Sequence, residues 1–191
     1  DDSQAGRRAC QRTTYKMKIG LAAWGVETIS AYNYFGPEHS YVICSEEPRD
    51  DFPTGDNIEI HFIDKPRQPG LTGNVADLSY LDPLADCELI VIITAARKNL
   101  EKHFGLDNEI WTKITDAERL FFENSPTKNI IGITGTKGKG TTSTLIHKML
   151  EASGHQAWLG GNIGNSPLDF IRELDENSWV VLEFSSFQLY K

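Results

Sequence analysis

The chain has 191 residues, of which 39% are hydrophobic and 24% are charged, a composition typical of globular proteins. Its formal net charge of −8 argues against nucleic acid as a partner, because nucleic-acid-binding proteins usually carry a basic face. No stretch of about 18 apolar residues occurs, so we expect neither a membrane-spanning helix nor a membrane partner.

The cysteines and the first residues bear on the compartment. Cys10, Cys44 and Cys87 are odd in number and far apart, which predicts neither a disulfide framework nor a metal site and indicates a reducing cytoplasm. Residues 1–16 lack the apolar centre of a secretory signal. We interpret them as a disordered tail before Met17.

Residues 17–126 predict a first α/β domain. Strands alternate with helices, and the near-continuous apolar run at 88–94 is typical of a parallel strand covered on both faces. Thr115 and Glu118 form a capping box that predicts the start of a helix, which Pro126 would end. The expected strands are 17–23, 41–44, 58–63 and 88–94, and the expected helices are 27–35 and 115–124.

Residues 127–191 predict the start of a second domain, with the boundary near 124–128. Its expected strands are 130–133, 156–159 and 179–184, and its expected helices are 141–153 and 167–174. Three strands are few for an open parallel sheet. We therefore expect a fragment that ends inside its second domain.

A glycine-rich turn at 135–140 joins the strand at 130–133 to a helix. Leu145, Ile146, Met149 and Leu150 predict the buried face of that helix. Glycines beside a helix N-terminus expose backbone amides, and the helix dipole favours a negative charge there. We expect this turn to bind the phosphates of a nucleotide, with ATP as the leading candidate.

The turn departs twice from the general phosphate-loop pattern. Ile133 stands where the first glycine is expected, and Gly140 instead of serine or threonine follows Lys139. The alternative is a turn without a ligand. That alternative leaves Lys137 and Lys139 repelling each other and the helix dipole, whereas a bound anion removes the conflict.

Two polar residues follow the other strands of this region. Glu183 ends an apolar strand, where it could face a nucleotide crevice and bind Mg²⁺ directly or through water. The alternative is an exposed glutamate on an edge strand. Asn162 lies between glycines, and it could equally serve turn geometry alone.

Three segments together resemble the Mur ligase family: GITGTKGKGTT at 132–142, GGNIGNSPL at 160–168 and LEFSSFQL at 182–189. The string SSFQL after a strand glutamate is the most specific of them. It is similar to the family members that add D-glutamate. The resemblance covers 129–191 strongly and 17–128 in outline.

The resemblance implies a Rossmann-like first domain that binds the UDP part of the substrate, followed by the first part of a P-loop central domain that binds ATP. It implies an ATP-dependent ligase of peptidoglycan synthesis that forms an amide through an acyl phosphate, with ATP and Mg²⁺ as cofactors. Its partners would be a UDP-linked muramoyl substrate and D-glutamate, and we expect a monomer.

The same resemblance assigns roles to individual residues. Lys139, Asn162 and Glu183 would be catalytic, and Thr141 with Glu183 would bind the metal. Ser185, Ser186 and Gln188 would line the substrate side. The nucleotide would be bound by Gly135, Thr136, Lys137, Gly138, Lys139, Gly140, Thr141 and Thr142.

The first domain departs from the family pattern at two places. AAWGVE (22–27) replaces a glycine-rich turn, and ITAARKN (93–99) replaces a Ser-Pro-Gly stretch. Ser45, Glu46 and Arg49 follow the second strand, where the family contacts its nucleotide substrate. The alternatives are a folylpolyglutamate synthase-like ligase, or a non-catalytic nucleotide-binding module if the protein ended at Lys191.

Overall fold

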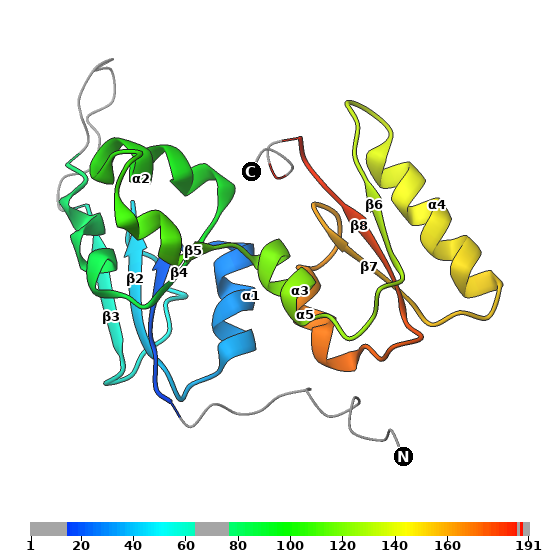
Figure 1. The fold of residues 1–191 in the computed structure, drawn as a ribbon, viewed down its shortest axis with the longest axis horizontal. Helices are drawn as coiled ribbons and strands as arrows, with labels where there is room; N and C mark the ends of the chain where they lie inside the picture. The colour runs from blue at the N-terminus through cyan, green and yellow to red at the C-terminus, as the bar shows by residue number, and fades with distance from the viewer. Residues whose placement is uncertain (1–14, 64–76, 187, 189–191) are drawn as a thin grey trace.

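The computed structural model describes residues 15–63, 77–186 and 188, which form two parallel β-sheets with helices between and around them (Figure 1). The predicted α/β class with parallel sheets is confirmed. The expected disordered tail, apart from residues 15 and 16, lies outside the described residues. In the described ranges, no helix is long and apolar enough to cross a membrane.

The first sheet has the strand order β3-β2-β1-β4-β5, and all its described pairs are parallel. Its centre is fully buried, because the central strands carry apolar side chains on both faces. The strands are β1 (Lys18–Ala22), β2 (Ser40–Ser45), β3 (Ile58–Phe62), β4 (Leu89–Ile92) and β5 (Ile114–Thr115).

Three α-helices accompany this sheet: α1 (Val26–Phe35), α2 (Arg97–Phe104) and α3 (Ala117–Asn124). The sequence analysis did not predict α2, nor the three 3₁₀ segments at Ser79–Asp86, Thr94–Ala96 and Glu109–Lys113. The predicted cap of α3 is wrong. Thr115 pairs with Val91 in the sheet, and the side chain of Asp116 accepts the capping hydrogen bond from the amide of Arg119 at 2.9 Å.

The second sheet has the order β6-β8-β7, also parallel, so the last strand in sequence lies in the middle. Its strands are β6 (Ile130–Ile133), β7 (Ala157–Gly161) and β8 (Trp179–Glu183). Helix α4 (Lys139–Ala152) lies on its outer face. Helix α5 (Pro167–Phe170) and a 3₁₀ turn at Ile171–Glu173 lie on the side of the first sheet (Figure 1).

The buried face of α4 differs from the predicted one. Leu145 and Met149 are 58% and 60% exposed, whereas Ser143 is fully buried. The helix begins at Lys139, two residues earlier than predicted, and its sheet-facing side runs through Ser143 and the partly buried Ile146 and Leu150. Half of the predicted apolar face was therefore wrong.

The two sheets share one apolar layer, formed by α1, α3 and α5 (Figure 1). Phe121 of α3 and Phe170 of α5 contact edge to face with ring centroids 6.3 Å apart. The guanidinium of Arg172 donates a 2.7 Å hydrogen bond to the carbonyl of Tyr34 at the end of α1. The change from one sheet to the other falls between Thr115 and Ile130.

Candidate functional site

The turn between β6 and α4 is built by glycines in conformations that other residues rarely adopt. Gly135 has a φ of 148° and Gly138, the N-cap residue of α4, has a φ of 77°. The first helical hydrogen bond runs from the amide of Thr142 to the carbonyl of Gly138. The amides that precede Thr142 in the first turn therefore have no acceptor within the helix and are available to an anion.

Lys139 folds back over this turn. Its Nζ donates a 3.0 Å hydrogen bond to the carbonyl of Gly135, and the side chain is partly covered. Lys137 is exposed at the tip of the same turn. The ammonium group has three donors, so donors besides the one used by the Gly135 carbonyl are available to a phosphate oxygen.

Glu183 ends the central strand β8, between Ile133 of β6 and Gly161 of β7. It is 8% exposed, and among the described residues its carboxylate has no hydrogen-bond or ion-pair partner. A Cβ atom built on Gly140 would lie 3.4 Å from its Oε2 atom, so the carboxylate faces the first turn of α4. The alternative of an exposed edge-strand glutamate is therefore wrong.

The loop after β7 closes onto the end of β8. The amide of Asn162 donates a 2.9 Å hydrogen bond to the carbonyl of Glu183, and the amide of Gly161 donates to the carbonyl of Asn165 at 3.1 Å. A Cβ on Gly161 would lie 2.3 Å from the Glu183 carbonyl oxygen, so only glycine permits this approach. The side chain of Asn162 is exposed beside the site.

The loops after β6, β7 and β8 thus meet at the carboxyl edge of one parallel sheet, where ligands of open α/β sheets commonly bind. The fold brings Lys139, Asn162 and Glu183 to this edge from segments that span more than forty residues. The chemical roles of these residues stay predictions.

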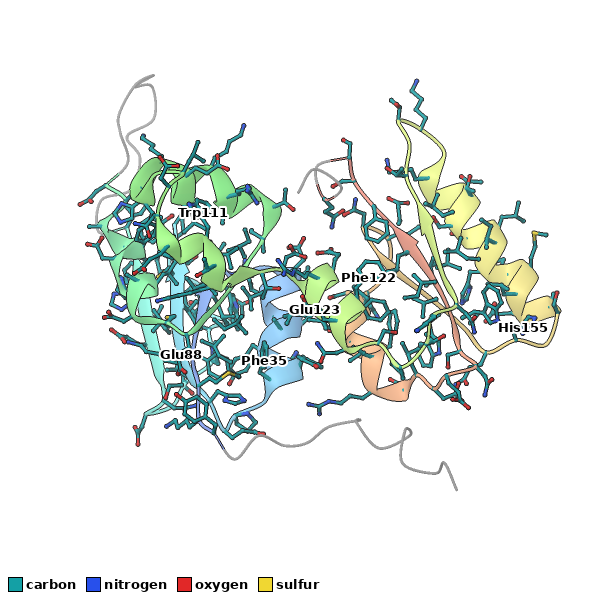
Figure 2. The ribbon with its side chains drawn as sticks, viewed as in Figure 1. Phe35, Glu88, Trp111, Phe122, Glu123 and His155 are labelled. Atoms are coloured by element: carbon teal, nitrogen blue, oxygen red, sulfur yellow. The ribbon has the colours of Figure 1, made fainter. Side chains whose placement is uncertain are left out.

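The turn after Glu183 is attached to α3. The side-chain oxygen Oε1 of Gln188 accepts a 2.7 Å hydrogen bond from the amide of Ser185, and its Nε2 donates a 2.6 Å hydrogen bond to Oε1 of the buried Glu118. Phe184 stacks on Phe122, which projects from α3 toward the second sheet in Figure 2, with ring centroids 6.1 Å apart. Gln188 is therefore committed to a contact within the protein.

Ser185 is half-buried, and its Oγ accepts a 3.3 Å hydrogen bond from the amide of Gln188, whereas Ser186 is exposed. Sequence reasoning treated Glu118 only as part of a helix cap and missed its contact with Gln188. No local pattern signals that contact, because the two residues are 70 positions apart.

The predicted metal ligands differ in exposure. Thr141 and Thr142 are exposed in the first turn of α4, whereas Glu183 is buried and its carboxylate faces Gly140 of that turn. Across the described ranges, no group of three or more His, Cys, Asp or Glu side chains could hold a metal ion. Mg²⁺ commonly binds to one or two carboxylates together with substrate phosphates, and Glu183 beside the glycine turn fits that donor set.

A second candidate region lies at the carboxyl edge of the first sheet, where β1 has β2 on one side and β4 on the other. A hollow of about 430 Å³ opens at this topological switch point. Ser45, Glu46 and Arg49, which the sequence analysis related to the substrate nucleotide, all line it. Trp24 and Asn99 line it as well, from the two segments that depart from the family pattern.

Polar contacts already order this hollow. Arg49 donates two 2.8 Å hydrogen bonds to Asp51 and one of 3.2 Å to the carbonyl of Trp24. The guanidinium lowers the pKa of the Asp51 carboxyl, because its hydrogen bonds favour the charged form. Asn99 donates to Glu46 at 2.7 Å.

The features at the carboxyl edges of the two sheets indicate the class of this protein. Parallel sheets, a glycine turn at a helix N-terminus and a hollow at a switch point are consistent with a Rossmann-like or Mur ligase domain.

Sequence comparison with known proteins gives more specific relatives. The chain is 40% identical to the UDP-N-acetylmuramoylalanine–D-glutamate ligase of Acetivibrio thermocellus over 111 residues, 58% of this chain and 23% of that protein. It is 40% identical to the ligase of the same name from Clostridium botulinum strain Loch Maree over 111 residues, 58% of this chain and 24% of that protein. It is 49% identical to the ligase of the same name from Clostridium novyi over 76 residues, 40% of this chain and 16% of that protein.

The resemblance predicted from the sequence is confirmed, because these curated relatives are named UDP-N-acetylmuramoylalanine–D-glutamate ligase. The matched region spans about a quarter of the length of the relatives. No family model matches the chain. Neither alternative, the folylpolyglutamate synthase-like ligase or the non-catalytic module, is favoured by these relatives.

Proposed function

We propose that the chain is part of an ATP-dependent ligase of peptidoglycan synthesis that joins D-glutamate to the carboxyl group of UDP-N-acetylmuramoyl-L-alanine. The observation that carries this proposal is the meeting of Lys139, Asn162 and Glu183 at one carboxyl edge of the second sheet. Similarity to ligases of that name supports the substrate class.

The turn and the first turn of α4, residues 135–142, bind the nucleotide phosphates in this proposal. Backbone amides and Lys139 neutralise negative charge on the phosphate oxygens, and Nζ donates to a phosphate oxygen from beside the carbonyl of Gly135. The γ-phosphoryl group passes to the substrate carboxylate and ADP leaves. The amine of D-glutamate then attacks the acyl carbon, and inorganic phosphate leaves.

Glu183 would hold Mg²⁺, directly or through a water molecule. The carboxylate has no hydrogen-bond partner among the described residues, so its oxygens are available to a cation, which supports this role. The metal supplies neutralisation of the charge that develops on the transferred group. Asn162 lies beside Glu183 and orients the substrate end that reacts.

The hollow at the first sheet receives the UDP end of the substrate. Ser45 and Asn99 offer hydrogen-bonding groups there, and Arg49 is held in place by Asp51. Ser185 and Ser186 lie on the side of the second sheet that carries Glu183 and line the substrate between the two regions.

Nucleotide binding tests the proposal. NMR titration of the 191-residue chain with ATP and Mg²⁺ should give a dissociation constant of roughly 0.1–1 mM, without turnover. Lys139→Ala should weaken ATP binding at least tenfold, which is about 1.4 kcal/mol. The matched control is Lys148→Ala, an exposed lysine on the same helix. Equal effects of the two substitutions would contradict the assignment of Lys139.

Turnover tests the substrate. The protein encoded by the full reading frame should release ADP in the presence of UDP-N-acetylmuramoyl-L-alanine, and the release should depend on D-glutamate. ADP release that D-glutamate does not affect would remove the substrate assignment and leave the nucleotide site intact.

A further inference from the structure

Position 140 is unusual at a site proposed to bind a nucleotide. In general phosphate loops the residue after the lysine is serine or threonine, and its hydroxyl binds Mg²⁺. Here that residue is Gly140, the second residue of α4. A role for this position in metal binding rests on the proposed function, because it requires the nucleotide to bind at this turn.

A side chain at position 140 would enter the space beside Glu183. A Cβ atom there would lie 3.4 Å from Oε2 of Glu183 and 3.1 Å from Cδ1 of Ile163. Two oxygen ligands in adjacent positions of an octahedral Mg²⁺ site are about 2.9 Å apart, given metal–oxygen distances of about 2.0–2.1 Å. A serine hydroxyl, one bond beyond Cβ, can reach that separation from Oε2.

The neighbouring hydroxyls do not replace the missing one. Thr141 lies one residue, or about 100°, further around the helix. It is exposed, on the same side as Leu145, which is 58% exposed. The buried Ser143 donates its hydroxyl to the carbonyl of Lys139 at 2.9 Å. Neither hydroxyl is directed to the carboxylate of Glu183 as a group at position 140 would be.

We propose that position 140 determines how strongly nucleotide binding at this site depends on Mg²⁺. With Gly140, the backbone amides and Lys139 supply the affinity, and the metal, held from the protein by Glu183, adds little. Gly140→Ser places a hydroxyl beside Glu183, completes a pair of oxygen ligands and makes ATP binding depend on Mg²⁺.

The test is titration of the 191-residue chain with ATP, in Mg²⁺ and in EDTA, for the native sequence, Gly140→Ser and Gly140→Ala. The native chain and Gly140→Ala should bind ATP with affinities that differ less than about threefold between the two conditions. Gly140→Ser should bind at least tenfold more tightly in Mg²⁺, which is about 1.4 kcal/mol. Gly140→Ala is the matched control, because it adds the same Cβ atom without the hydroxyl.

Thermal unfolding of each variant reports whether it is folded. If Ile163 resists the added atom, the same comparison is made in an Ile163→Val background, which removes the Cδ1 contact. The inference would be overturned if Mg²⁺ raised the ATP affinity of the native chain tenfold, or if it raised the affinity of Gly140→Ser no more than that of Gly140→Ala. Either result would leave the proposed function intact. ATP binding to none of the variants in either condition would overturn the proposed function with it.

Discussion

Gly161 permits the closest backbone approach at the candidate site, and Gly161→Ala should therefore be severely destabilising. The residue has a φ of 93°, and its missing Cβ would lie 2.3 Å from the carbonyl oxygen and 3.0 Å from the nitrogen of Glu183. Both atoms belong to the backbone of β8, which is paired on its two sides. Neither can move without disturbing the sheet.

The magnitude follows from three costs. A left-handed conformation costs a residue with a Cβ about 1–2 kcal/mol. Forcing an atom into a filled space costs about 1–3 kcal/mol. Weakening the hydrogen bond from the Asn162 amide to the Glu183 carbonyl costs about 1 kcal/mol. Gly161→Ala should lower the free energy of unfolding by about 3–6 kcal/mol, a large part of the stability of an ordinary domain.

Gly154→Ala is the matched control. Gly154 has a φ of 83° and follows α4, but nothing lies within 4 Å of its missing Cβ. It should therefore show only the conformational cost of about 1–2 kcal/mol. Urea denaturation followed by circular dichroism measures both variants. If the two substitutions destabilise equally, the contact with Glu183 contributes nothing and the reasoning fails.

Two further predictions concern titratable groups. Burial raises the pKa of the Cys87 thiol to about 11 and also raises the pKa of the Cys44 thiol. Iodoacetamide at pH 8 should therefore modify both cysteines only after unfolding, which peptide mass spectrometry measures. Labelling of either cysteine in the folded state would contradict its burial. The hydroxyl of Ser178 donates a 2.9 Å hydrogen bond to Asp175 and lowers the pKa of that carboxyl. The ionised Asp175 should therefore stabilise the fold above about pH 4, and this stabilisation should be lost as the pH falls through the lowered pKa. Denaturation measured between pH 2 and 6 should show that acidification lowers the free energy of unfolding less in Asp175→Asn than in the native chain. Identical losses of stability would exclude this carboxyl as a contributor to the pH dependence.

Local signals predicted most of the strands and the glycine turn. Apolar runs such as 130–133 and 179–184 were placed to within a residue, because a buried parallel strand needs apolar side chains on both faces. Helix boundaries were less accurate. Both Thr115 and Asp116 can cap a helix, and the sheet pairing of Thr115 decided between them.

The face that α4 buries could not be read from its apolar residues. Leu145 and Met149 follow the helical period, yet they point to solvent, while Ser143 is covered because the helix begins at Lys139 and packs where β8 lies. Packing against a particular strand decides which stripe of a helix is buried. The helical period of the apolar residues does not by itself identify that stripe.

For the candidate site, the sequence by itself determined which residues are proposed to carry the chemistry. The glycine turn, Lys139, Asn162 and Glu183 were all identified from local pattern and resemblance, since glycine conformations and a carboxylate on an apolar strand are local facts. Only the tertiary structure decided that β8 lies between β6 and β7, because strand order depends on contacts between distant segments. That order buries Glu183, turns it toward Gly140 and commits Gln188 to Glu118.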